Sequence, residues 1–141
     1  MGFCGYDNAG DLFVDGSTSG SAFAFADLPK GGASFKKISL NHSLGFPGGV
    51  QWDGTHVAVG DRDTNVIYQF AISGAKGKEV GSTPLIGASD VNQFWIDGPK
   101  VIGSDSAAAD VMFWNYPSGG SHTKTIGGLN EPVGATVSKG E

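Results

Sequence analysis

Acidic and amide side chains alternate in one short segment that has the composition of a cation site. Asp61, Asp63 and Asn65 stand at every second position, and carboxylate and amide oxygens are the ligands that Ca²⁺ prefers in proteins. An EF-hand loop counted from Asp61 would need Gly at its sixth position and Glu at its twelfth, but Val66 and Ile72 stand there. The pattern therefore favours the alternative role, in which the aspartates cap the backbone amides of a turn.

Three further residues complete the candidate ligand-binding set. Asp105 lies 44 residues after Asp61, and Asn130 and Glu131 adjoin each other near the end of the chain. Together with Asp61 and Asp63, these side chains would suit a cation or a polyhydroxylated ligand. The cation would be Ca²⁺, and no other cofactor is expected. The segment that Asn130 and Glu131 begin also has the composition of an ordinary turn, since proline follows.

No residue is predicted to be catalytic, and no transition-metal site is expected. His42, His56 and His122 share no metal-binding spacing, which a zinc site would require. Cys4 is the single cysteine, so no intrachain disulfide can form, and a buried, inert thiol is the expected state. The serine-rich segment 16–20 does not match the Gly-x-Ser-x-Gly motif of a nucleophile elbow.

Composition limits the classes of partner. The chain has 141 residues with a net charge of −5 and a single arginine, so a basic surface that follows phosphates is excluded and no nucleic-acid partner is expected. No apolar run approaches the ~20 residues of a membrane span, and the first residues lack the basic and apolar regions of a signal peptide. We therefore expect a soluble chain without an export signal, and the compartment is not indicated.

A repeat of constant length organises the sequence. Gly10, Gly54 and Gly98 are spaced by 44 residues, each between two apolar runs, and Asp-Gly in this setting is a hairpin signal. The 24 glycines have no collagen-like period and are assigned to turns. Four antiparallel strands per unit follow, and units of this size are typical of β-propeller blades. A plain β-sandwich is the alternative fold. In the middle unit the predicted strands are 49–52, 56–60, 66–72 and 78–85.

The phase of the repeat predicts an incomplete ring. The chain is expected to form one all-β domain, 1–141, of three blades and a surplus innermost strand. Three blades make a half-circle with open strand edges and apolar faces, so we expect a homodimer that closes six blades, or a trimer that closes nine. The surplus strand would pair with the first blade of a second copy, replacing or flanking residues 3–7. The predicted bounds are 3–45, 46–88 and 89–129 for the blades and 130–139 for the strand.

The repeat also has recurring residues. The middle unit reads Pro47-Gly-Gly-Val-Gln-Trp-Asp-Gly54, and Asp-Gly recurs at Asp97 and Gly98 in the third unit. The blades resemble those of NHL-type six-bladed propellers, whose superfamily includes gluconolactonase-like hydrolases. Val66 stands where NHL repeats often have arginine. Further matching positions are Val57, Asp61 and Phe70 in the middle unit, Val101, Asp105 and Trp114 in the third, and Gly10, Leu12, Val14 and Phe25 in the first.

Three functional interpretations follow. The first is a self-assembling half-propeller that acts as a binding or scaffold module without catalytic activity. The second comes from the resemblance, which implies a metal-dependent hydrolase in which Asn130 and Glu131 would hold a divalent metal that polarises a carbonyl or activates water. The third is a natural or engineered fragment of a larger propeller without activity of its own. Blade motifs record how a blade folds, so they favour the architecture more than any activity.

Overall fold

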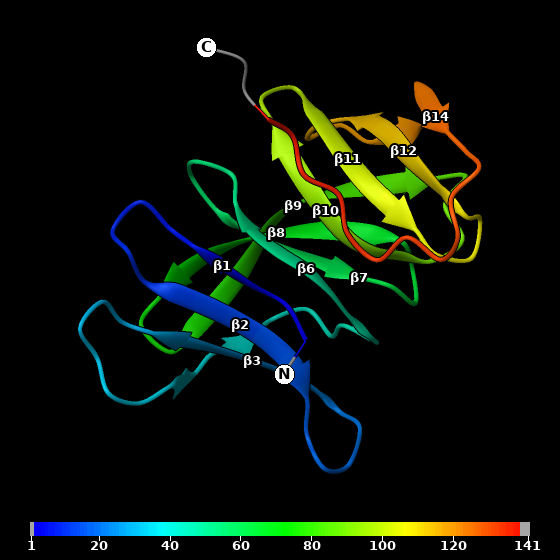
Figure 1. Cartoon of the computed structure of the whole chain (residues 1–141). Coiled ribbons are helices and arrows are strands. Elements are labelled where there is room, and N and C mark those ends of the chain that lie inside the picture. The colour runs from blue at the N-terminus through cyan, green and yellow to red at the C-terminus, as the bar shows by residue number, and fades with distance from the viewer. Residues whose placement is uncertain (1, 139–141) are drawn as a thin grey trace.

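The chain folds entirely into β-structure. A computed structural model describes residues 2–138, and within them every regular element is a strand. Three antiparallel sheets follow one another along the chain (Figure 1), and we call them blades 1, 2 and 3. Blade 1 contains β1 (Cys4–Tyr6), β2 (Leu12–Ser17), β3 (Phe23–Leu28) and β4 (Lys36–Lys37). Blade 2 contains β6 (Pro47–Trp52), β7 (Val57–Asp61), β8 (Val66–Ser73) and β9 (Lys76–Ile86). Blade 3 contains β10 (Val91–Asp97), β11 (Lys100–Asp105), β12 (Asp110–Asn115) and β14 (Lys124–Ile126).

The predicted strands of the middle unit are confirmed, each within two residues of its observed bounds. The hairpin between β6 and β7 contains Gly54 at φ 103, and the equivalent hairpin of blade 3 contains Gly98 at φ 55. Residues with side chains rarely adopt such positive φ values, so glycine is favoured in these tight turns. The common turn explains why the same dipeptide recurs at a constant distance.

Two hydrophobic cores hold the blades face to face. Between blades 1 and 2, Phe13 and Phe25 of the first sheet pack with Val57, Val59 and Phe70 of the second. Side chains alternate between the two faces of a strand, so blade 2 uses its other face toward blade 3. There the core consists of Ala58, Ile67, Leu85, Val91, Phe94, Ile96, Val101, Met112 and Trp114.

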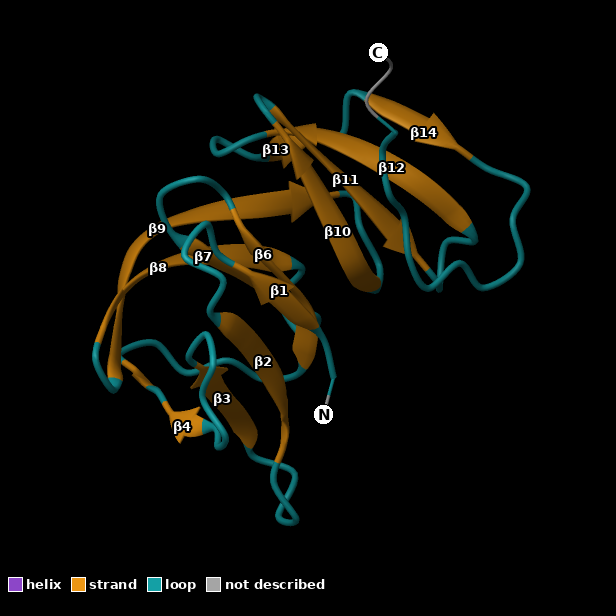
Figure 2. Cartoon of the chain, turned by 60° about the vertical axis from the view of Figure 1, so that its left-hand side comes forward, coloured by secondary structure: helices purple, strands orange, loops and turns teal. Residues whose placement is uncertain are grey.

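Two short strands that the sequence did not predict tie neighbouring blades together. β5 (Ser39–Leu40) pairs in parallel with the beginning of β9, and β13 (Gly120–Ser121) pairs in parallel with its end. Both strands belong to segments outside blade 2, so β9 is the element to which the flanking blades attach. Figure 2 shows blades 1 and 3 at opposite ends of the row, with blade 2 between them.

The predicted surplus strand is absent from the single chain. Residues 127–138, which we call the tail, contain no strand, and the last predicted residue, 139, lies outside the described residues. A strand needs a neighbour to accept and donate its backbone hydrogen bonds, and the tail has no sheet edge of this chain beside it. Its beginning is nevertheless anchored, because Leu129 N donates to Ala109 O at 3.1 Å.

Candidate functional site

The carboxylate of Asp61 is a backbone cap. It is 4% exposed at the end of β7, and it accepts hydrogen bonds from the backbone N–H of Gly45, Phe46 and Asp63 at 3.2, 3.1 and 3.1 Å. The first two donors belong to the segment that enters blade 2, and the third lies in the turn after β7. This side chain therefore fixes the entering segment against the turn.

Asp105, 44 residues later, accepts two equivalent hydrogen bonds from the segment that enters its blade and a third from the turn that follows it. It is fully buried and accepts from the backbone N–H of Ser89, Asp90 and Ala108 at 2.5, 3.1 and 2.9 Å. Ser89 and Asp90 stand 44 residues after Gly45 and Phe46. The capping alternative thus describes the contacts of both aspartates, and it uses the oxygens that a cation would need.

An ionic network joins the turn of blade 2 to the entry of blade 3. Arg62 donates from Nε and Nη2 to the two carboxylate oxygens of Asp90 at 2.8 and 2.7 Å. Asp90 also accepts from Ser106 Oγ at 3.0 Å, and Asn92 Nδ2 donates to that Oγ at 2.7 Å. The hydrogen bonds from Arg62 hold the pKa of Asp90 below its usual value, and Asp90 raises the pKa of Arg62.

Asn65 completes this junction. Its backbone has φ 51, a left-handed conformation that asparagine tolerates. Its Oδ1 accepts from Val91 N at 3.0 Å, and its Nδ2 donates to Ser89 O at 3.3 Å. Both polar atoms of the Asn65 side chain therefore form hydrogen bonds with the backbone at the entry of blade 3.

The other predicted ligand residues do not converge on one site with Asp61 and Asp105. Asp63, Asn130 and Glu131 are exposed, and Glu131 has φ 46. Within residues 2–138, no group of three or more His, Cys, Asp and Glu side chains is arranged to hold a metal ion. The same residues include no helix with the length and apolar character to cross a membrane.

A groove of about 380 Å³ runs along the innermost strands of all three blades. Gln51 fixes two of these strands, because its Nε2 donates to Ile96 O at 3.2 Å and its Oε1 accepts from Ile96 N at 2.7 Å. The expectation of a buried Cys4 is wrong: the thiol is exposed, because no blade covers that face of β1. The groove is lined by Cys4, Tyr6, Gln51, Trp52, Gln93 and Trp95, among others.

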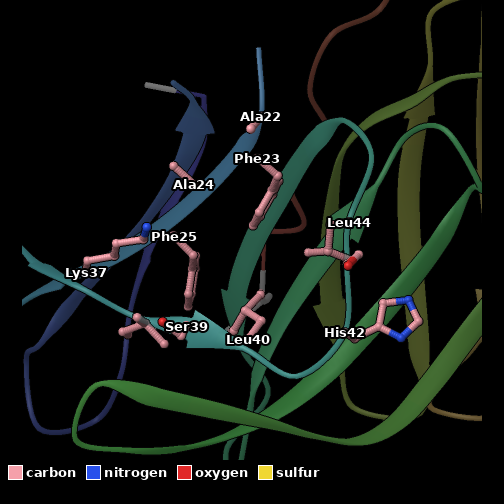
Figure 3. Close-up of a pocket in the computed structure, with 11 residues that line it drawn as sticks. Ala22, Phe23, Ala24, Phe25, Lys37, Ser39, Leu40, His42 and Leu44 are labelled. Carbon is pink, nitrogen blue, oxygen red and sulfur yellow. The ribbon is translucent and has the colours of Figure 1, made fainter. Parts of the chain in front are cut away.

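A second pocket, of about 350 Å³, lies between the beginning of β3 and the link from blade 1 to blade 2. Figure 3 shows Phe23 and Phe25 on one wall and Leu40, His42 and Leu44 on the link. His42 is engaged, since its Nδ1 lies 2.9 Å from Glu79 Oε2 and its ring lies 4.1 Å from that of Tyr68. His42 and Lys37 are the titratable residues among those that line the pocket. The pocket therefore offers binding space without a nucleophile and base in contact.

Asp15 and Asp53, which lie outside these sites, have shifted pKa values. Burial raises the pKa of Asp15 to about 7, although Phe3 N donates to it at 2.6 Å. Burial would also raise the pKa of Asp53, but hydrogen bonds, first of all from Tyr116, lower it below its usual value. Tyr116 Oη donates to Asp53 Oδ2 at 2.6 Å, and burial followed by this bond raises the pKa of Tyr116. This hydrogen bond forms a further link between blades 2 and 3.

Comparison with known proteins gives a fold and no family. No family model matches the chain, and no curated protein matches it. Among solved structures, it is similar to a 6-phosphogluconolactonase-like protein from Bacteroides fragilis, with a TM-score of 0.61 and 11% identity over 83% of this chain and 36% of that one. It is also similar to BamB from Moraxella catarrhalis, with a TM-score of 0.51 and 16% identity over 88% of this chain and 35% of that one.

These similarities support a propeller-like arrangement of the blades. The chain spans about a third of the length of both structures. At such low identity the similarity concerns the fold alone, because unrelated functions share propeller folds.

Proposed function

We propose that this chain is a half β-propeller that closes into a ring with a second copy and serves as a binding or scaffold module. The observation that carries the proposal is the position of exposed hydrophobic side chains. Tyr6, on the outer face of blade 1, is 65% exposed, and Ile126 and Val133, at the other end of the row, are 45% and 68% exposed. Such side chains at the ends of an open row favour association.

The outer faces of blades 1 and 3 lie opposite to the faces that pack against blade 2 inside the chain. Tyr6 and Leu12 are cross-strand partners and lie on the face of blade 1 opposite to Phe13 and its core. Trp95 and Ile102 are partners in blade 3, on the face opposite to Val101. Since both internal junctions bury apolar side chains, docking these two outer faces would repeat the same kind of contact. Two such seams would provide the ~1,000 Å² or more that a specific interface needs.

A binding role is favoured over catalysis because the buried and half-buried polar side chains at the blade junctions are already hydrogen-bonded within the chain. Asp61, Asp105, Asp90 and Asn65 are engaged in bonds that hold the blades together, and their oxygens accept hydrogen bonds from the chain itself. A catalytic acid or base needs access to the proton that it transfers. The ligand-binding role of Asp61, Asp63, Asp105, Asn130 and Glu131 stays a prediction, and the groove between the innermost strands is a second location for a ligand.

The metal-dependent hydrolase remains the alternative, with the resemblance to NHL-type propellers as its basis and the lactonase-like structural neighbour as its support. In that interpretation Asn130 and Glu131 would hold the metal. Elemental analysis of dialysed protein separates the two. Stoichiometric Ca²⁺ or Zn²⁺ that disappears in the variant Glu131→Gln would favour the hydrolase, whereas metal-free protein that assembles normally would favour the binding module.

The assembly itself is tested by light scattering coupled to size exclusion over a range of concentrations. We expect a mass near twice 14.4 kDa, which corresponds to a closed ring of six blades. A mass near three times that value would replace the dimer by a ring of nine blades. A folded monomer at every concentration would contradict the proposal.

A further inference from the structure

The path of the tail reproduces the start of a blade. Leu129 N donates to Ala109 O at 3.1 Å, and 44 residues earlier Leu85 N donates to Asn65 O at 2.9 Å. Ala109 and Asn65 both have positive φ, 60 and 51. In blade 2, the chain that leaves Leu85 crosses to the innermost strand of the next blade. The tail therefore leaves blade 3 in the direction of a fourth blade.

The tail then lies against the outer face of blade 3. A Cβ on Gly134 would touch Gln93 Oε1, and Figure 1 shows the tail, in red, passing over β10 and β11. Gly49 lies 44 residues before Gln93, and a Cβ on it would touch Phe94 of β10. The tail thus contacts blade 3 at the position where β10 contacts blade 2.

From Gly134 to Ser138, the burial of the tail alternates with a period of two. Ala135 and Val137 are half-buried, while Gly134, Thr136 and Ser138 are exposed. Alternation with a period of two is typical of a strand that packs one face on a neighbour. Within the described residues, however, the segment 130–138 has no strand pairing. It has the packing of an innermost strand and lacks the ladder.

Blade 1 has the weakest innermost strand of the three. β1 has 3 residues, whereas β6 has 6 and β10 has 7. Its central residue is Gly5, and Cys4 and Tyr6 on either side are exposed. Glycine weakens a strand, whereas β-branched residues such as Thr136 and Val137 favour it. An exchange of β1 for the tail of another molecule would therefore replace a poor strand by a better one.

We infer that the tail forms the innermost strand of a blade whose other three strands are β2, β3 and β4 of a second copy, displacing β1 of that copy. This inference rests on the proposed self-assembly and specifies how the seam is built. Hydrogen bonding of an added strand to a sheet edge is a common mode of recognition. The occupant is a second copy because the tail continues the 44-residue repeat of this chain.

The register of the exchange follows from the faces of the strands. Cys4 pairs with Val14 in the chain as it stands, and residues directly opposite in an antiparallel pair share a face. A Cβ on Gly134 would touch Gln93 of blade 3, so in a strand the side of the tail that carries Gly134 and Ser138 faces blade 3. In the closed ring, the face of blade 1 that carries Val14 faces the same blade. Ser138, which lies 44 residues after Phe94 of β10, consequently takes the place of Cys4, opposite Val14 of the other copy.

Paired cysteines test this register. In a Cys4→Ala background, the variant Val14→Cys with Ser138→Cys is expected to form a covalent dimer on mild oxidation, seen on a non-reducing gel. The matched control is Val14→Cys with Val137→Cys, whose thiols lie on opposite faces of the ladder and cannot meet disulfide geometry. Equal cross-linking of both proteins, or of neither, would overturn the exchange.

A second variant avoids any change in the folded blades. Val137→Asp places a charge in the seam, and Val80→Asp places one at an exposed position on β9 of the middle blade. We expect the first to raise the dimer dissociation constant about tenfold or more, because an unpaired charge would be buried, and the second to leave it unchanged. A dimer that is indifferent to Val137→Asp would contradict the exchange and leave the proposed assembly standing. A wild-type monomer would contradict the assembly itself.

Discussion

Asp61 and Asp105 occupy equivalent positions in successive blades, and each carboxylate accepts three backbone hydrogen bonds. In both cases two donors belong to the segment that enters the blade and the third belongs to the turn that follows the aspartate. The recurrence shows that these residues belong to the construction of the blade.

Asp105→Asn should destabilise the fold. The amide nitrogen would replace one of the two oxygens that accept from Ser89, Asp90 and Ala108, leaving a buried donor without an acceptor at a cost of ~1–3 kcal/mol. Urea unfolding followed by circular dichroism measures the change in the free energy of unfolding. Asp63→Asn is the control, because Asp63 is exposed and surface changes stay within about 0.5 kcal/mol. Equal losses would contradict the capping role.

The repeat allowed the strands to be predicted, and their contacts explain why. Hairpin glycines such as Gly54 and Gly98 are favoured by local backbone geometry, so the sequence alone contains that information. The same holds for Asp61 and Asp105, which were predicted as turn caps. The network of Arg62 and Asp90 is different, because it links residues 28 positions apart, and nothing in the local sequence indicates that they meet.

The ion pair between Arg62 and Asp90 should couple blades 2 and 3. A double-mutant cycle with Arg62→Met and Asp90→Asn, measured by urea unfolding, should give a coupling energy of ~0.5–1 kcal/mol, because the pair is partly exposed but bidentate. The coupling should decrease in high salt. The pair Arg62 and Asp63 serves as a control for charge attraction without the two hydrogen bonds that Arg62 donates to Asp90, so its coupling should be smaller. Comparable coupling in both cycles would contradict a specific brace.

Asp15 should make the fold less stable as the pH rises. Burial raises its pKa from 3.8 to about 7, so between these values the folded state holds a proton that the unfolded state has released. Unfolding then becomes easier with increasing pH up to about 7, and the effect is constant above it. Asp15→Asn, which cannot ionise, should remove this decline and be more stable than the wild type at pH 8.

Urea midpoints of both proteins at pH 5 and pH 8 provide the measurement. Asp90 acts in the opposite direction, because its lowered pKa gives stability that is lost on acidification. Asp15→Asn therefore has to be compared with the wild type at each pH. Parallel pH profiles of the two proteins would exclude Asp15 as the cause.

The error at Cys4 and the absence of a ladder along the tail of the single chain have one physical origin. Both predictions assumed a closed ring, in which a neighbouring blade covers Cys4 and supplies a ladder to the tail. The single chain provides neither, so the thiol is exposed and the tail has no strand. Gln51 could not be predicted for a related reason: its bonds to Ile96 depend on how two blades pack, which the pattern within one blade does not contain.

Leu12→Glu should weaken self-assembly without unfolding the chain. Leu12 is half-buried on the outer face of blade 1 and belongs to β2, which stays in the blade when β1 is displaced, whereas a seam with blade 3 of a second copy would have to bury a charge. Val80→Glu is the matched control, because Val80 is 49% exposed but lies on β9 of the middle blade. Sedimentation equilibrium should show a dissociation constant increased by about tenfold or more, ~1.4 kcal/mol, for the first variant and an unchanged one for the second. If Val80→Glu disrupts the assembly and Leu12→Glu does not, the chains associate through the outermost strands of their blades, and the open ends of the row are not the interface.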